Sequence, residues 1–270
     1  MIRMLLATIG GLILAFAACS REEAPNWNSL ADGLELGQFE LSQKSATGDS
    51  TIRILRVDPT HFELRVLCAS ELGHGSLTAS EWRERYDLVA VTNAGMFDVD
   101  HSSHVGYLRN GDHVNQPKTH PDYSSVAAFD PGFRIFDTDE VDFETEIAPK
   151  FDVVIQNLRL IKRPGENRWS RQPKEWSEAA LGEDANGNAL FIFCRSPYSM
   201  HDLNLQLLDL PIDLVAAQHL EGGPEASLEI VIDDFSLSLM GSFETDFNEN
   251  DANREFWPIP NVIGLARIDE

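Results

Sequence analysis

The chain has 270 residues, of which 43% are hydrophobic and 24% are charged, a composition typical of a folded globular protein. Its 44 acidic and 21 basic residues give a formal net charge of −23. A surface this acidic repels nucleic-acid phosphates and anionic lipid headgroups, so we expect no nucleic-acid partner. Three cysteines are too few for a disulfide scaffold.

The first residues have the pattern of a targeting segment. Residues 1–18, with Arg3 before an apolar run, are predicted to be a signal peptide. The run ends at Ala17-Ala18-Cys19, which resembles a bacterial lipobox and makes Cys19 the candidate lipidation site. The alternative is a plain secretory signal cut near Ala18. The mature chain is therefore expected to be exported, either as a periplasmic or outer-membrane lipoprotein of the cell envelope or as a secreted protein. A lipid anchor at the N-terminus would be its only attachment to a membrane.

The mature chain begins with a polar segment, residues 19–33, which we interpret as a tether, and residues 34–270 are predicted to form one domain. Alternating apolar and polar residues predict a hairpin of two strands at 51–57 and 62–68. Thr78 and Glu81 form a capping box that predicts a helix start. A short buried strand at 88–92 then ends at Asn93.

The rest of the chain reads as short strands between turns. Asn110-Gly111 and Asp130-Pro131-Gly132 are turn signals, and Ser199 caps a predicted helix at 202–208. Further strands are predicted at 34–41, 106–108, 113–114, 126–129, 133–136, 153–161, 179–181, 189–194, 214–220, 228–232, 237–239 and 262–268. Many strands and few short helices predict an α+β fold: a single domain with a mostly antiparallel or mixed β-sheet.

Two predicted strands end in the same way, with a polar side chain followed by glycine. One runs into Asn93-Ala94-Gly95, and the other runs into Glu221-Gly222-Gly223. A sheet can hold such a side chain rigidly, while glycine lets the backbone approach a ligand closely. Ordinary strand-to-turn junctions are the alternative interpretation of each motif taken alone.

Four motifs in order resemble the phosphodiester glycosidase family. They are Asn93-Ala94-Gly95, the hairpin Gly106 to Gly111, the segment Ala180 to Asp184 followed by Gly187, and His219-Leu220-Glu221-Gly222-Gly223 with Ser227-Leu228. The resemblance covers most of the mature chain. It implies hydrolysis of the glycosidic bond of a sugar-1-phosphodiester, with an N-acetylglucosamine-like sugar, in the cell envelope.

The resemblance also implies the site residues. Glu221 stands where the family has Asp and is the candidate catalytic carboxylate, with Asn93 beside it. Gly95, Gly106, Gly222 and Gly223 are candidate substrate-binding positions. Glu178 stands where the family often has Arg, so Arg195 is the candidate phosphate-binding cation, with Arg109 and Arg159 as alternatives.

Three points stay open at this stage. A second carboxylate is sought among Asp98, Asp202 and Glu225. No cofactor or metal is predicted, although His101, His104, His113 and His120 crowd into twenty residues and leave a metal-dependent hydrolase as one hypothesis. Cys68 and Cys194 are expected to be buried thiols, with a disulfide as the alternative. A non-catalytic carbohydrate- or envelope-binding lipoprotein on the same scaffold is the main alternative function.

Overall fold

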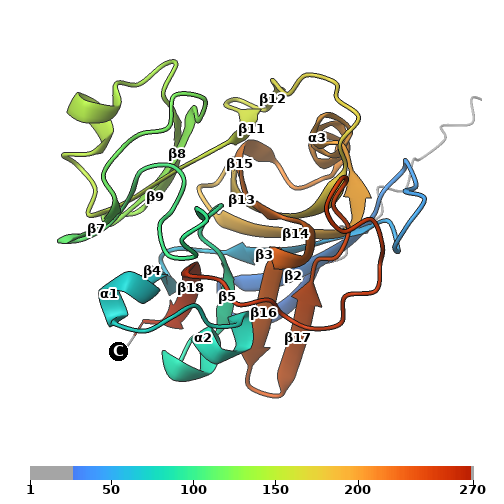
Figure 1. Ribbon diagram of the computed structural model, residues 1–270, viewed down its shortest axis with the longest axis horizontal. Coiled ribbons are helices and arrows are strands. Elements are labelled where there is room, and N and C mark those ends of the chain that lie inside the picture. The colour runs from blue at the N-terminus through green and yellow to red at the C-terminus, as the bar shows by residue number, and fades with distance from the viewer. Residues whose placement is uncertain (1–26, 269–270) are drawn as a thin grey trace, which may run out of the picture.

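A computed structural model describes residues 27–268 and has three β-sheets, in which all pairings between strands are antiparallel (Figure 1). Sheet I has eight strands in the order β1-β2-β3-β14-β13-β15-β11-β12. Their bounds are β1 Trp27–Ala31, β2 Leu34–Glu40, β3 Thr51–Val57, β14 Ala189–Tyr198, β13 Trp176–Asp184, β15 Leu214–Gly222, β11 Arg159–Lys162 and β12 Glu166–Asn167.

Sheets II and III have five strands each. Sheet II has the order β7-β6-β10-β8-β9, with bounds His113–Gln116, Leu108–Asn110, Val153–Asn157, Ser125–Phe129 and Phe133–Asp137. Sheet III has the order β17-β16-β5-β18-β4, with bounds Phe235–Met240, Ser227–Ile232, Ala90–Asn93, Asn261–Arg267 and Phe62–Cys68.

The helices are few and short, as the sequence predicted. The α-helices are α1 (Ala69–Leu72) and α2 (Ala79–Arg85), which pack beside sheet III, and α3 (Met200–Asp209), which packs on β11 and β12. A π-helical turn covers Phe143–Ile147, and a 3₁₀ turn covers Gly223–Glu225. The capping box at Thr78 is confirmed, and Ser199 caps α3. No helix within residues 27–268 is long and apolar enough to cross a membrane.

The main hydrophobic core joins all three sheets. It contains Phe191 from sheet I, Ile155 from sheet II, and Ile230 and Ile263 from sheet III, all fully buried. Burial of this kind contributes about 25 cal/mol per Å² of apolar surface. The three sheets therefore pack against one another around a shared core.

The N-terminal part of the domain differs from the expected tether over residues 19–33. Trp27–Ala31 form β1, which pairs with β2. The ring of Trp27 packs edge-on against Phe39, and the Arg56 guanidinium lies 3.8 Å from the centre of the Trp27 ring. These contacts on neighbouring strands, and not an alternating pattern of its own, make this polar segment a strand. The signal peptide, Cys19 and the first part of the tether lie outside the described residues.

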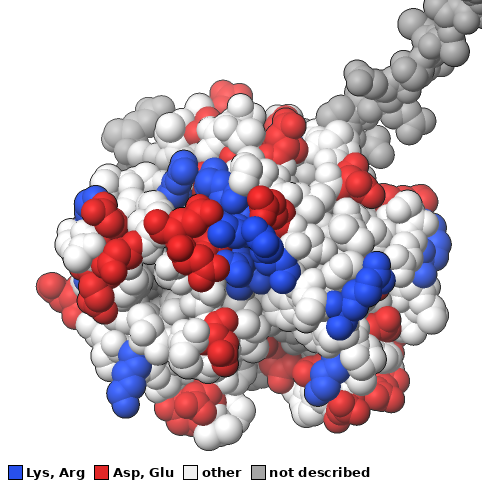
Figure 2. All heavy atoms as spheres, turned by 90° about the horizontal axis from the view of Figure 1, so that it is seen from above, with Lys and Arg blue, Asp and Glu red and all other residues white. Residues whose placement is uncertain are grey.

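Charged residues are mixed on the face shown in Figure 2, where Lys and Arg gather in one patch flanked by Asp and Glu. Ion pairs also join β11 to β9 and to the turn that follows it. Arg159 lies 2.6 Å from Asp137 and 2.7 Å from Asp139, and Lys162 lies 3.0 Å from Glu140. The excess of acid is thus locally balanced where sheets I and II meet.

Candidate active site

The candidate site lies where one strand end from each sheet meets the others. These are the ends of β5 in sheet III, β10 in sheet II and β15 in sheet I. The Asn157 side chain, at the last residue of β10, donates to Ala94 O after β5 at 2.9 Å, and His219 N in β15 donates to Leu158 O at 2.9 Å. The two motifs singled out by the sequence are therefore brought together at one junction.

Asn93 is buried in this junction, with 1% of its surface exposed. Its side-chain NH₂ donates to Glu225 O at 3.0 Å, and its side-chain oxygen accepts from Ser227 N at 2.8 Å. Both polar ends of the amide therefore hold the turn that follows Glu221. The structure places Asn93 against the backbone of the turn that follows the predicted carboxylate.

Gly95 and Gly106 stand where other parts of the chain approach their backbone closely. Gly95 has φ of 151°, and a Cβ on it would overlap both His104 Nε2 and the side-chain oxygen of Asn157. A Cβ on Gly106 would lie 2.5 Å from Gln156 O. Close packing thus accounts for both glycines, which the sequence had suggested as substrate-binding positions.

Gly222 and Gly223 have the same property beside Glu221. A Cβ on Gly222 would lie 2.7 Å from Cδ1 of Trp176, and one on Gly223 would lie 2.6 Å from a carboxylate oxygen of Glu244. Gly223 also has φ of 63°, a backbone conformation that favours glycine. Because Gly222 and Gly223 have no side chains, the Trp176 indole and the Glu244 carboxyl group can pack against the end of β15.

Three glutamates form a carboxyl cluster at this point: Glu221, Glu225 and Glu244. Burial raises the pKa of Glu221 to about 8, with the nearby charges of Glu225 and Glu244 adding to it, while His219 and the Gly222 N–H work against the rise. Burial likewise raises the pKa of Glu225 to about 7 and raises that of Glu244. Near neutral pH the cluster therefore holds protons as well as negative charge.

Glu244 comes to the cluster from a long segment after β17. Ser177 in β13 holds that segment, since Ser177 N donates to Phe243 O at 2.8 Å and Ser177 Oγ accepts from Ser242 N at 3.0 Å. Tyr123 approaches from the sheet II side. Burial raises the pKa of Tyr123 to about 12, and the charge of Glu221 is the next contribution.

Glu178 and His219 form a buried pair on neighbouring strands of sheet I. His219 Nδ1 lies 2.8 and 2.9 Å from the two carboxylate oxygens of Glu178, and Trp176 Nε1 donates to one of them at 2.7 Å. Glu178 is 0% exposed and His219 3%. Burial raises the pKa of Glu178. In His219 burial acts to lower the pKa, but the neighbouring carboxylates, Glu178 first, outweigh it and raise the pKa.

The Arg195 guanidinium is engaged by the end of β17 and the segment after it. It donates to Met240 O and to Asn253 O at 2.9 Å, and it lies 2.7 Å from a carboxylate oxygen of Asp251. It therefore holds the segment that carries Glu244. The two alternative arginines are also engaged, Arg159 by the carboxylates already described and Arg109 by Ala148 O at 2.8 Å.

The four clustered histidines have separate environments. His104 is enclosed, with Nδ1 2.9 Å from Gly106 O, and burial lowers its pKa to about 4. His113 contacts Ser70, His120 stacks on Tyr123, and His101 packs near Phe97. Among residues 27–268, no group of three or more His, Cys, Asp or Glu is arranged to hold a metal ion.

Cys68 and Cys194 are both buried free thiols. Burial raises the pKa of Cys68 to about 12 and raises that of Cys194 still further. Neither sulfur is therefore a nucleophile at neutral pH.

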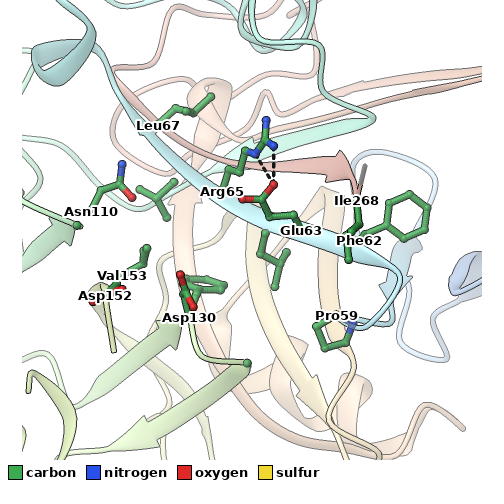
Figure 3. Close-up of a pocket in the computed structure, with 15 residues that line it drawn as sticks. Pro59, Phe62, Glu63, Arg65, Leu67, Asn110, Asp130, Asp152, Val153 and Ile268 are labelled. Carbon is green, nitrogen blue, oxygen red and sulfur yellow. Dashed lines mark hydrogen bonds and ion pairs between the residues drawn. The ribbon is translucent and has the colours of Figure 1, made fainter. Parts of the chain in front are cut away.

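A separate hollow of about 680 Å³ lies between β4 and the turns of sheet II (Figure 3). Asn110, Asp130 and Asp152 face Glu63 and Arg65 across it, and those two residues pair with each other. None of its lining residues belongs to the carboxyl cluster. We place the chemistry at the cluster, because carboxyl groups with raised pKa values converge there.

Sequence reasoning did not identify His219, Glu244 or Tyr123 as site residues, and it left Glu225 among alternatives. One signal was present for the buried pair. Glu178 and His219 are ionisable residues inside otherwise apolar strand patterns, and buried charges require partners. No local pattern marks Glu244, because its place depends on contacts with β13.

Comparison with known proteins agrees with this architecture. The model of the phosphodiester glycosidase family matches residues 86–266. The catalytic domain of zebrafish N-acetylglucosamine-1-phosphodiester alpha-N-acetylglucosaminidase, auto-inhibited by its pro-peptide, is 17% identical with a TM-score of 0.59, over 92% of this chain and 87% of that one. A hypothetical protein from Synechocystis is 12% identical with a TM-score of 0.62, over 91% of this chain and 64% of that one. A search of the curated proteins gave no match.

Proposed function

Because the chain belongs to the phosphodiester glycosidase family, we propose that it is an exported hydrolase that cleaves the glycosidic bond of a sugar-1-phosphodiester. The zebrafish protein of similar fold is named for an N-acetylglucosamine phosphodiester, which suggests an N-acetylglucosamine-like sugar for this chain as well. The pattern of residues 1–19 supports a site of action in the cell envelope or outside the cell.

The observation that carries the proposal is the convergence of Glu221, Glu225 and Glu244. Glycosidic hydrolysis passes through a sugar with positive charge at C1, which a carboxylate stabilises or attacks. It also benefits from a carboxyl group that still holds a proton at working pH. Raised pKa values of about 8 and 7 for Glu221 and Glu225 allow one cluster to supply both forms.

Glu221 is the group we assign to the sugar carbon. It lies at the end of β15 and loses its proton around its raised pKa of about 8, and the Gly222 N–H, which donates to its carboxylate at 3.1 Å, favours that ionised form. A phosphate monoester departs readily, so the leaving group needs little protonation. Glu225 and Glu244 are then available to accept the proton of the attacking water.

One observation favours the alternative of a non-catalytic carbohydrate-binding lipoprotein. Arg195, Arg159 and Arg109 are all committed to other partners, so no arginine of this set is directed at a phosphate. Carboxyl groups beside the Trp176 indole also suit the binding of sugar hydroxyls. On that account the cluster binds a glycan and leaves its bonds intact.

The test is turnover by the mature chain on a panel of sugar 1-(methyl phosphates), with free sugar measured as product. We expect release of an N-acetylamino sugar together with methyl phosphate. Saturable binding of the same compounds by calorimetry, without release of sugar, would replace the hydrolase with the binding protein. If the chain neither binds nor cleaves any compound of the panel, both the hydrolase and the binding protein are refuted.

A further inference from the structure

We propose that His219 is a further catalytic residue, whose Nε2 contacts the phosphate of the bound substrate and supplies the positive charge that this leaving group needs. The proposal rests on the proposed phosphodiester glycosidase function. It assigns the phosphate-binding role to a residue that the sequence did not single out.

The orientation of His219 is fixed from one side only. Glu178 accepts from Nδ1 with both oxygens, at 2.8 and 2.9 Å, and Trp176 Nε1 holds the same carboxylate at 2.7 Å. A carboxylate on Nδ1 keeps a proton on that nitrogen and fixes the plane of the ring. Glu178 is therefore a positioning residue that leaves Nε2 as the working end.

Nε2 of His219 has no hydrogen-bond partner among residues 27–268, and it keeps some contact with solvent. His104 shows the contrast, because its Nε2 is fully enclosed without a partner and cannot meet a ligand. A histidine that is held at one nitrogen and open at the other is arranged to meet a ligand.

The charges facing His219 come from three elements: Glu178 in β13, Glu221 in β15 and Glu244 in the segment after β17. All three carboxylates favour the imidazolium form. Of the charged groups acting on Glu221, His219 is the cation, whereas Glu225 and Glu244 are acidic. The charge of Lys174 also acts on Glu244, but Lys174 pairs with Asp246 at 3.3 Å.

An imidazolium at this place fits the electron balance of the reaction. The bond between C1 and the phosphate oxygen breaks, and its electron pair stays on that oxygen. Water supplies the new C1 hydroxyl and gives its second proton to a carboxylate of the cluster. The His219 Nε2–H stabilises the departing phosphate by a charge-assisted hydrogen bond.

The kinetic test compares two leaving groups on one sugar: methyl phosphate and 4-nitrophenolate. His219→Gln should lower kcat/KM about 10- to 100-fold for the phosphodiester, the range expected for one hydrogen bond to a charged group. Turnover of the nitrophenyl glycoside should change less than about threefold, because its aglycone has no phosphate oxygens for the His219 Nε2–H to contact. His201→Gln, which removes a histidine paired with Asp202 on α3, is the matched control and should change neither. Equal losses on both substrates, or no loss, would overturn the assignment.

A binding test does not depend on turnover or on the His219→Gln protein being folded. In the wild-type chain, the NMR titration of the His219 ring should move to higher pH when methyl phosphate is added. Glu178→Gln should lower the ring pKa, shift the pH profile of kcat/KM in the same direction and weaken methyl phosphate binding. An unchanged titration at saturating methyl phosphate, or no binding of it, refutes the His219 role. Failure of the wild type to cleave any phosphodiester refutes the proposed function instead.

Discussion

Two buried glutamates on the same strand, β13, have different surroundings. Glu183 lies near one end, where Ile135 N donates to it at 2.7 Å and the guanidinium groups of Arg163 and Arg134 pair with it. Glu178 lies near the other end and meets a histidine and an indole N–H. Both are at most 2% exposed.

The difference lies in the partner. An arginine keeps its charge at every working pH, so Glu183 is a permanent connection between sheet I and sheet II. A histidine gains and loses its proton near neutral pH, so we expect the Glu178 end to respond to protons and, on the role proposed for His219, to bound anions. The same residue type on one strand thus serves the structure at one end and the chemistry at the other.

The largest effect on stability is expected at the chemical end, from Asn93→Ala. The change leaves Glu225 O and Ser227 N without their partner, at about 1–3 kcal/mol for each buried group. Urea denaturation should show a loss of about 2–4 kcal/mol in the free energy of unfolding. Asn110→Ala, at an exposed hairpin, is the control. A loss below about 0.5 kcal/mol would mean that Asn93 does not hold the turn.

A smaller loss is expected at the structural end, from Glu183→Gln. The amide still accepts from Ile135 N, but the ion pairs with two partly exposed arginines are lost, at about 1–2 kcal/mol. Denaturation should show this loss, and kcat should stay within twofold of wild type. A large fall in kcat with an intact fold would erase the contrast between the two glutamates.

The carboxyl cluster should make stability depend on pH. An unfolded glutamate ionises near 4.5, whereas Glu221 in the fold keeps its proton up to about 8. Raising the pH between these values therefore favours unfolding, because the unfolded chain binds fewer protons than the fold does. Glu221→Gln cannot ionise, so it should gain stability relative to wild type at pH 8 but little at pH 5. The exposed control Glu255→Gln should differ from wild type by the same amount at pH 5 and pH 8. The same result for Glu221→Gln would mean that the pKa of Glu221 is not raised in the fold.

The smallest effect is expected from Arg195→Lys. A lysine keeps the charge near Asp251 but cannot reach Met240 O and Asn253 O together. The segment bearing Glu244 should loosen, seen as faster hydrogen exchange there and at most a few-fold loss of kcat/KM. A loss of kcat/KM above about 100-fold on the phosphodiester, with no loss on the nitrophenyl glycoside, would mean that Arg195 binds the phosphate.

Local chemistry made much of the fold predictable from the sequence. Thr78 and Glu81 sit three residues apart and cap α2, and strong turn signals such as Asn110-Gly111 lie where strands reverse. The two polar strand ends, Asn93 and Glu221, also meet as their shared pattern suggested. For the cap and the turns the deciding interaction lies within a few residues along the chain, whereas Asn93 reaches the turn after Glu221 through long-range hydrogen bonds.

The rest depended on contacts that span the chain. Glu178 faces His219 because β13 and β15 pair in one register, and Glu244 arrives through hydrogen bonds with Ser177. Arg195 was expected just after the strand 189–194 and lies within β14, and its guanidinium is held by a segment about sixty residues later. Such partners leave no periodic signal in the sequence.

The most direct test of the account measures kcat for Glu221→Gln and Glu183→Gln in one assay on a cleaved sugar 1-(methyl phosphate). Glu221→Gln should lose at least about 100-fold, as expected for one essential catalytic group, while it still binds the substrate. Glu221→Asp should retain part of the activity because the carboxylate is kept, and Glu183→Gln should turn over like wild type. Wild-type kcat in the Glu221→Gln protein would contradict the account, because the carboxyl cluster would then not be where the glycosidic bond is cleaved.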